Sequence, residues 1–125
     1  MEITKVDSVG VPSTNTERSR AFYVETLGLR PDERSWNEFW IGRTCFAIWE
    51  PARWGGEFQP QTNGIALLHV DDVAVAREEL EAKGVSFDGE TVDTGVCHMA
   101  VFADPDGNPL VLHKRYAPYS DGSTP

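Results

Sequence analysis

The chain has 125 residues, of which 40% are hydrophobic and 25% charged, and its formal net charge at pH 7 is −9. This length fits one domain with its own hydrophobic core, and the composition is that of a folded protein rather than a disordered one. The negative charge argues against nucleic acid and anionic membranes as partners, because their phosphate groups would be repelled. It would favour a cationic ligand, although a need for solubility explains it better.

No apolar run is long enough to span a bilayer, and the amino terminus lacks an apolar signal segment. We therefore expect a cytoplasmic protein. The two cysteines, Cys45 and Cys97, fall in predicted strands without C-x-x-C spacing. This favours reduced, buried thiols over a disulfide or a zinc site.

A strand and a helix are predicted at the start of the chain. Residues 3–11 fit a strand that ends at Pro12. Thr14 and Glu17 have the spacing of a capping box, which predicts that a helix begins there, and the helical pattern stops at Gly28.

Three further strands complete a first module of about residues 3–50. They are predicted near residues 29–34, 36–41 and 44–49. Gly42 and Arg43 make the last connection a tight hairpin. The proline- and glycine-rich residues 51–64 then read as a connecting loop.

The second half repeats this order in a module of about residues 65–115. An apolar strand at 65–70 precedes a helix that Asp71-Asp72 can cap and Gly84 ends. Strands follow near residues 85–88, 96–103 and 109–114, and residues 116–125 form a tail without a pattern. Two β-α-β-β-β modules predict a single α+β domain, residues 1–125, in which the sheets curl into a shared cleft.

Five short motifs occur in order along residues 3–115: Phe22-Tyr23, Leu27-Gly28-Leu29, Val70-Asp71-Asp72-Val73, Leu80 with Gly84-Val85, and the turn Asp104-Pro105-Asp106-Gly107-Asn108-Pro109. As an ordered set they resemble the vicinal oxygen chelate superfamily, which includes glyoxalases, bleomycin resistance proteins, fosfomycin resistance enzymes and extradiol dioxygenases. The resemblance implies paired modules, usually in a homodimer, with a U-shaped cleft where the enzymes hold a divalent metal. Fold alone does not choose among these activities.

The resemblance also indicates where metal ligands would stand. Enzymes of the superfamily usually take them from the first strand, from the strand that opens the second module and from the last strand. The matching positions here are Ser8, a place among Asn63, Gly64 and Ile65, and Val111. None is a usual ligand, because these metals need carboxylate or imidazole donors. We therefore expect no metal at the usual place and no cofactor.

Histidines offer a route to an unusual metal site, and a soft site could also recruit Cys45 or Cys97. By alternation His69 and His113 are predicted to face the cleft, whereas His98 faces the other way. Together with Glu38 they could act as metal ligands or as acid and base, which leaves a lyase- or dioxygenase-type enzyme open. The simpler interpretation makes both of them hydrogen-bonding or edge residues.

The same alternation makes the predicted cleft apolar and rich in tryptophan. Glu38, Trp40 and Trp49 would face it from the first module, and Met99 from the second. Trp54, on the glycine-rich loop, is placed as a lid. Facing tryptophans can hold a flat molecule without a metal, and Glu38 would attract a cation. Alternatively, the tryptophans fill the core and a dimer interface.

The favoured hypothesis is a glyoxalase- and bleomycin-resistance-like protein that lacks the usual metal ligands, forms a homodimer and binds a small aromatic or cationic molecule. The predicted ligand-binding residues are Glu38, Trp40, Trp49, Trp54, His69, Met99 and His113. The enzyme named above is the alternative, and the sequence does not decide whether any reaction is catalysed. A plain interaction protein with a filled cleft is the third interpretation.

Overall fold

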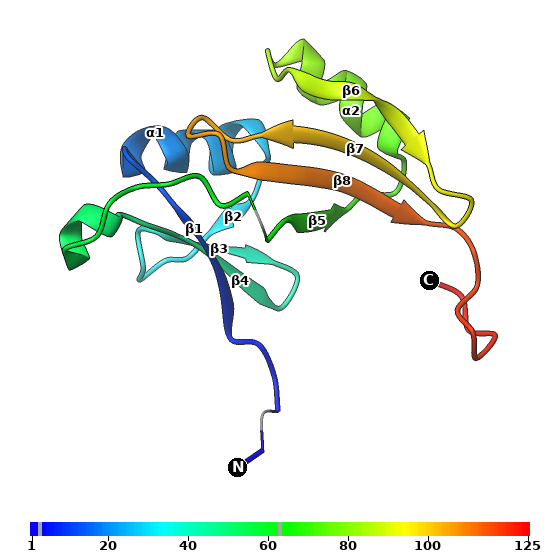
Figure 1. The fold of residues 1–125 in the computed structure, drawn as a ribbon, viewed down its shortest axis with the longest axis horizontal. Coiled ribbons are helices and arrows are strands. Elements are labelled where there is room, and N and C mark those ends of the chain that lie inside the picture. The colour runs from blue at the N-terminus through cyan, green and yellow to red at the C-terminus, as the bar shows by residue number, and fades with distance from the viewer. Residues whose placement is uncertain (3, 63) are drawn as a thin grey trace. The chain divides into compact units, whose positions relative to one another are not determined.

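The computed structural model describes residues 1–2, 4–62 and 64–125, and its chain divides into two compact units. The first unit consists of Met1–Gln61 with Pro105–Asn108, and the second of Thr62–Asp104 with Pro109–Pro125. Each contains one mixed, open four-stranded sheet and few helices (Figure 1). The predicted α+β class and the repeated β-α-β-β-β order are confirmed. Within the described residues, no helix has the length and apolar character needed to cross a membrane.

The first unit contains β1 (Ser8–Pro12), α1 (Thr16–Ala21), the π-helix η1 (Phe22–Thr26), β2 (Arg30–Pro31), β3 (Glu38–Ile41), β4 (Thr44–Trp49) and the 3-10 helix η2 (Pro51–Trp54). Its sheet has the order β1-β4-β3-β2, in which β1 runs parallel to β4 and the other pairs are antiparallel. Alternation sends Phe39, Phe46 and Ile48 to the side of η1, where the Tyr23 ring centroid lies 5.1 Å from that of Phe46. These four side chains are at most 3% exposed and form the core of the unit.

Two starting points in this unit differ from the sequence predictions. The first strand begins at Ser8 rather than at residue 3, which lies outside the described residues. Helix α1 is capped by Asn15, whose side chain accepts the Arg18 backbone N–H at 3.0 Å, and not by Thr14. Asparagine is as good a cap as threonine, and the Thr14 hydroxyl is engaged elsewhere, on Asp106.

The strand predicted near residues 29–34 shrinks to two residues for a local reason. Pro31 cannot donate a ladder hydrogen bond, and the carboxylate of Asp32 accepts the backbone N–H groups of Arg34 and Ser35, each at 2.8 Å. This side-chain turn ends β2 early. The predicted loop after β4 contains η2 instead, because Pro51 fits the first turn of a helix.

The second unit contains β5 (Ala66–His69), α2 (Val73–Ala82), β6 (Phe87–Asp93), β7 (Cys97–Ala103) and β8 (Pro109–Arg115). Its sheet has the order β5-β8-β7-β6. Asp72 caps α2, as its carboxylate accepts the Val75 N–H at 3.0 Å. Strand β6 runs longer than predicted because its register shifts between Asp88 and Val92, where Gly89 has a φ of 72°.

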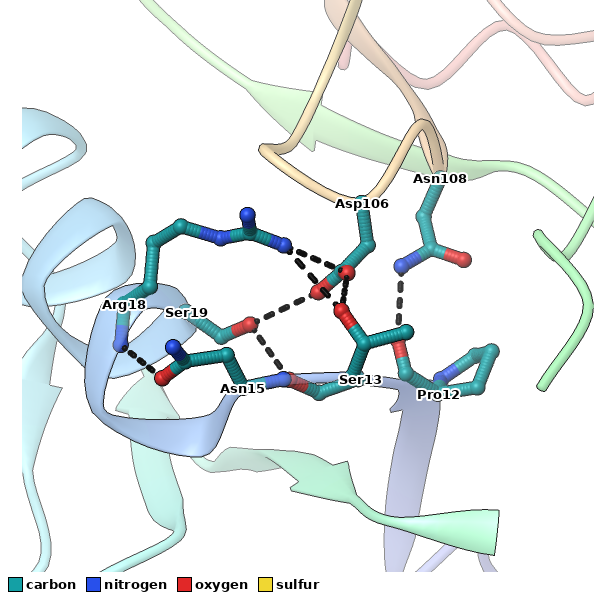
Figure 2. A network of polar contacts seen from close by, with 8 residues as sticks. Pro12, Ser13, Asn15, Arg18, Ser19, Asp106 and Asn108 are labelled. Atoms are coloured by element: carbon teal, nitrogen blue, oxygen red, sulfur yellow. Dashed lines mark hydrogen bonds and ion pairs between the residues drawn. The ribbon is translucent and has the colours of Figure 1, made fainter. Parts of the chain in front are cut away.

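The turn between β7 and β8 belongs to the first unit, and the carboxylate of Asp106 ties it to the start of α1 (Figure 2). Asp106 accepts hydrogen bonds from Arg18 Nη2 at 2.7 Å, from Ser19 Oγ at 3.1 Å and from the Thr14 hydroxyl. Its side chain is 2% exposed. Burial opposes ionisation, but the bonds from Thr14 and Ser19 and the charge of Arg18 outweigh it and hold the pKa of Asp106 below its ordinary value.

Asn108 fixes the other end of the same turn. Its Nδ2 donates to the Pro12 carbonyl at 2.8 Å, and its Oδ1 accepts the Gln61 N–H at 2.9 Å. The side chain is fully buried, so both backbone groups depend on it for a partner in place of water. The strongest local motif of the sequence therefore joins the end of β1 and the chain after η2 within the first unit.

Candidate functional site

One face of the first unit's sheet carries three of the seven ligand-binding residues that the sequence predicts, Glu38, Trp40 and Trp49. The strand register places these residues on the side opposite the aromatic core, together with Ser8, Gly10, Pro12, Ala47 and the buried Cys45. We use the name tryptophan face for five residues on that side: Gly10, Glu38, Trp40, Ala47 and Trp49.

Trp40 and Trp49 stand at opposite ends of the tryptophan face. Trp40 is paired with Cys45, and Trp49 follows four residues later on β4. A strand rises by about 3.3 Å per residue, so the two positions are about 13 Å apart along the sheet. Gly10 and Ala47 are paired with each other between them. The two indoles thus flank a flat strip of the sheet, where Gly10 exposes only backbone and Ala47 only a methyl group.

Both indoles are supported from below. Trp40 Nε1 donates to Asp32 Oδ2 at 2.8 Å, and this bond is the main reason that the pKa of Asp32 lies below its ordinary value. A methyl group at Gly10 would lie 3.5 Å from Trp49 Cδ1, so the indole of Trp49 rests against β1. Trp49 nevertheless stays 43% exposed. The half-buried Trp40 and the more exposed Trp49 are therefore positioned without being covered.

Glu38 supplies negative charge between the two indoles. It is half-buried and paired with Ala47, next to the buried thiol of Cys45. Burial, followed by the carboxylate of Glu38, raises the pKa of Cys45. A thiol with a raised pKa is a poor nucleophile at neutral pH, so Cys45 is not an activated cysteine.

Three further predicted residues form one row across the second unit's sheet. His69 on β5 pairs with His113 on β8, which pairs with Met99 on β7. His98 is on the opposite face, as its register with Lys114 requires. His69 is exposed, with Nε2 3.8 Å from Asp71 Oδ1, and it borders a pocket of about 450 Å³ at the start of α2.

The positions that match the superfamily's metal ligands do not fit a metal. Val111 lies between Leu67 and Val101 in the sheet and is 4% exposed, so a buried aliphatic group stands where a carboxylate would be needed. Ser8 offers only a hydroxyl, and Asn63 lies outside the described residues. In the part of the chain that the structure describes, no three His, Cys, Asp or Glu side chains gather as a metal site would require.

Trp54 belongs to a different surface. It lies in η2, is 83% exposed, and lines a pocket of about 310 Å³ within the first unit. Trp36 and Trp49 line this pocket too, so three of the four tryptophans border it. Asn37, Ile48, Thr16, Glu50 and Arg53 complete the wall. We call it the indole pocket.

Sequence reasoning missed the indole pocket because Trp36 was assigned to a strand. The structure begins β3 at Glu38, which leaves Trp36 in the preceding turn. The one available signal was that Trp36 and Trp54 both occur beside proline, glycine or polar turn residues, where an indole has no strand neighbours to pack against. Their proximity to one pocket depends on the pairing of β3 with β4.

Comparison with known proteins agrees with this fold. The family model described as Glyoxalase/Bleomycin resistance protein/Dioxygenase superfamily matches residues 5–112. None of the curated proteins matches the chain significantly.

Three solved structures illustrate the likeness. An integron cassette protein, HFX_CASS4, from the mobile metagenome of the Halifax Harbour sewage outfall is 29% identical, with a TM-score of 0.71 over 89% of this chain and 98% of its own. TnmS3, an antibiotic binding protein from Streptomyces sp. CB03234, is 28% identical, with a TM-score of 0.72 over 92% and 98%. Lactoylglutathione lyase from Agrobacterium tumefaciens, at 15% identity and a TM-score of 0.74 over 90% and 94%, shares the fold alone.

The match to the family model covers most of the chain, and the repeated module order and the Asp104–Asn108 turn agree with it. The chain therefore belongs to the glyoxalase, bleomycin resistance protein and dioxygenase superfamily.

Proposed function

We propose that this protein binds a planar organic molecule, neutral or cationic, on the tryptophan face and does so without a metal. The observation that carries the proposal is the pair of supported indoles, Trp40 and Trp49, at the two ends of a strip floored by Gly10 and Ala47. A flat ring system can lie on this strip and contact an indole at either end. Because aromatic side chains offer large contact areas at low entropic cost, two of them suffice to hold such a ligand.

The charge of the site supports a neutral or cationic ligand. Glu38 lies between the indoles, and Asp32 lies under Trp40. Indole rings attract cations through their electron-rich faces, and the chain as a whole carries a net charge of −9. An anion would be repelled by the nearby carboxylates of Glu38 and Asp32, and no cationic side chain of the tryptophan face would offset this repulsion.

The family relationship is consistent with a binding role. TnmS3, at 28% identity over nearly its whole length, is described as an antibiotic binding protein. We extend that role to this chain as a proposal, together with homodimer formation and a cytoplasmic location. Sedimentation velocity over a range of protein concentrations tests the dimer.

The direct test uses proflavine, a planar cation, as the probe. Titration is followed by the ¹H–¹⁵N resonances of the four indole N–H groups and by calorimetry, in the presence of a metal chelator. We expect Trp40 and Trp49 to shift together. Trp40→Leu should weaken binding about tenfold, since a stacked aromatic pair contributes about 0.5–1.5 kcal/mol beyond its buried area. Glu38→Gln should weaken the binding of proflavine and leave the binding of a neutral planar probe unchanged.

The control is Trp54→Leu, which removes an indole outside the tryptophan face and should leave proflavine binding unchanged. Proflavine that binds equally well to Trp40→Leu, or that requires a metal, would contradict the proposal.

The alternative is an enzyme, and one observation favours it. His69 and His113 are direct neighbours across β5 and β8, which is the arrangement in which two imidazoles can share a metal or a proton. Elemental analysis after loading with Mn, Fe, Ni and Zn tests it. Stoichiometric metal that is lost in His69→Ala and His113→Ala would replace the binding proposal with this one.

A further inference from the structure

The indole pocket has a chemistry opposite to that of the tryptophan face, and Arg53 is the reason. Arg53 Nε donates to Glu50 Oε2 at 2.7 Å, and its backbone N–H donates to the Glu50 carbonyl at 3.1 Å. The guanidinium is thus held at its inner edge. Its Nη groups donate no hydrogen bond to the residues that the structure describes, and the side chain is 73% exposed at the pocket wall.

Glu50 is fully engaged as the anchor of Arg53. Besides Arg53, the hydroxyl and backbone N–H of Thr16 stabilise its charged form, and together they lower the pKa of Glu50, with Arg53 as the main cause. The carboxylate therefore stays ionised at neutral pH and keeps the guanidinium in place. A guanidinium presents its donors in a planar fork that matches a carboxylate.

The charges near the pocket do not favour a cation. The charged side chains that line it are Arg53 and Glu50, which are paired with each other. Arg20 does not line the pocket, but its guanidinium lies 5.2 Å from the Trp36 ring centroid and its Nη1 donates to the Trp36 carbonyl, so Trp36 already has a positive charge beside it. The negative charge of the whole chain acts over a longer range, and salt screens it beyond about 8 Å.

The rest of the wall suits an aromatic ring. Three tryptophans border the pocket. A volume of about 310 Å³ is at the lower end of the range for small-molecule sites, roughly 300–1,000 Å³. One or two fused rings therefore match the space.

We propose that the indole pocket is a second ligand site, which binds a planar aromatic carboxylate with its ring against Trp36 and Trp54 and its carboxylate on the Nη groups of Arg53. This inference is independent of the proposed function, whose ligand is neutral or cationic and lies on the tryptophan face. Trp49 borders both surfaces, but its indole lies against Gly10, so Trp36 and Trp54 are the reporters for the pocket.

The test titrates the full chain with 2-naphthoate and with 2-naphthamide, which has the same rings without the charge. The four indole N–H resonances, assigned with single Trp→Phe variants, report which surface responds. We expect saturable shifts at Trp36 and Trp54, with Trp40 unmoved because it does not border the indole pocket. Naphthamide should bind about tenfold more weakly or worse, because a charge-assisted fork is about twice as strong as neutral hydrogen bonds.

Variants of Arg53 complete the test. Arg53→Gln should weaken naphthoate binding about tenfold. The affinity of Arg53→Lys should lie between those of the wild type and Arg53→Gln, because lysine keeps the charge but loses the fork of donors. Arg43→Gln is the matched control: it removes the same charge from an exposed turn of the same unit and should leave affinity unchanged. Proflavine binding to Trp40 should persist in all three, so failure of this inference is distinguishable from failure of the proposed function.

Three results would overturn the inference. One is equal binding of naphthoate and naphthamide by the wild type, a comparison that needs no variant to fold. Another is unchanged naphthoate affinity in Arg53→Gln. The third is a set of Trp36 and Trp54 shifts that follow protein concentration and ignore naphthoate, which would show that a second copy of the chain covers the pocket.

Discussion

Asp106→Asn offers the sharpest test of how the turn between β7 and β8 holds the first unit together. Thr14, Arg18 and Ser19 all donate hydrogen bonds to the Asp106 carboxylate, and the side chain is 2% exposed. Asparagine has the same shape as aspartate, and its side-chain oxygen can still accept hydrogen bonds from two of these three residues. The Ser19 hydroxyl can rotate to accept from the new amide.

What the substitution removes is the charge that strengthens these bonds. Hydrogen bonds to a charged group contribute about 1.5–3 kcal/mol each, against about 1 kcal/mol for neutral ones. We therefore expect Asp106→Asn to lower the free energy of unfolding by about 2–3 kcal/mol, and Asp106→Ala, which leaves Arg18 without this carboxylate, by about 3–5 kcal/mol. Urea unfolding at pH 7, with an unchanged slope, is the measurement.

The loss must also depend on pH. The folded pKa of Asp106 is depressed, so its contribution is fully present above the unfolded value of about 4 and disappears as the pH falls through the lower folded value. The gap between the wild type and Asp106→Asn should therefore narrow in acid. Asp121→Asn is the control, because that carboxyl also has a lowered pKa, from Ser123, but lies in the exposed tail. A difference in the free energy of unfolding below about 0.5 kcal/mol at pH 7, or a difference that does not change with pH, would refute the reasoning.

Three further predictions concern other parts of the first unit. Asn108→Ala should destabilise by about 2–4 kcal/mol in urea unfolding, because two buried backbone groups lose their partner; a loss below about 1 kcal/mol would contradict this. Gly107→Ala should cost about 1 kcal/mol, because Gly107 has a φ of 85°, and thermal unfolding that matches the wild type would argue against it. Glu38→Gln should let iodoacetamide alkylate Cys45 at lower pH, since that carboxylate helps to raise the thiol pKa; an identical pH profile by mass spectrometry would exclude this coupling.

Much of the candidate binding surface was predictable because it depends on alternation along single strands. Once Phe39 and Phe46 are assigned to the core, Glu38 and Trp40 must lie on the other face, and the register agrees. Alternation likewise predicted that His69 and His113 face one way, whereas their direct pairing is known only from the register of β5 and β8. Whether these residues bind a ligand stays a prediction, as does the dimer.

Predictions of boundaries failed where a polar side chain had two possible partners. Thr14 and Glu17 fit a capping box, yet Asn15 caps the helix because the Thr14 hydroxyl bonds to Asp106, 92 residues away. Likewise, the strand expected after Gly28 ends at Pro31 because Asp32 bonds to its own turn and to Trp40. Local propensity ranks such partners but does not decide which of them the folded chain brings closest.

We could predict from the sequence the order of the elements, the faces of the strands and the turn from Asp104 to Asn108, because each follows from the conformational limits of a few consecutive residues. The folded chain was needed to show that Trp36, Trp54 and the Glu50–Arg53 pair border one pocket. Those residues come from separate segments that β3–β4 pairing and η2 position, and no spacing along the chain encodes that proximity. The physical reason is that side-chain direction along a strand is a local property, whereas convergence of distant segments depends on the packing of the whole unit.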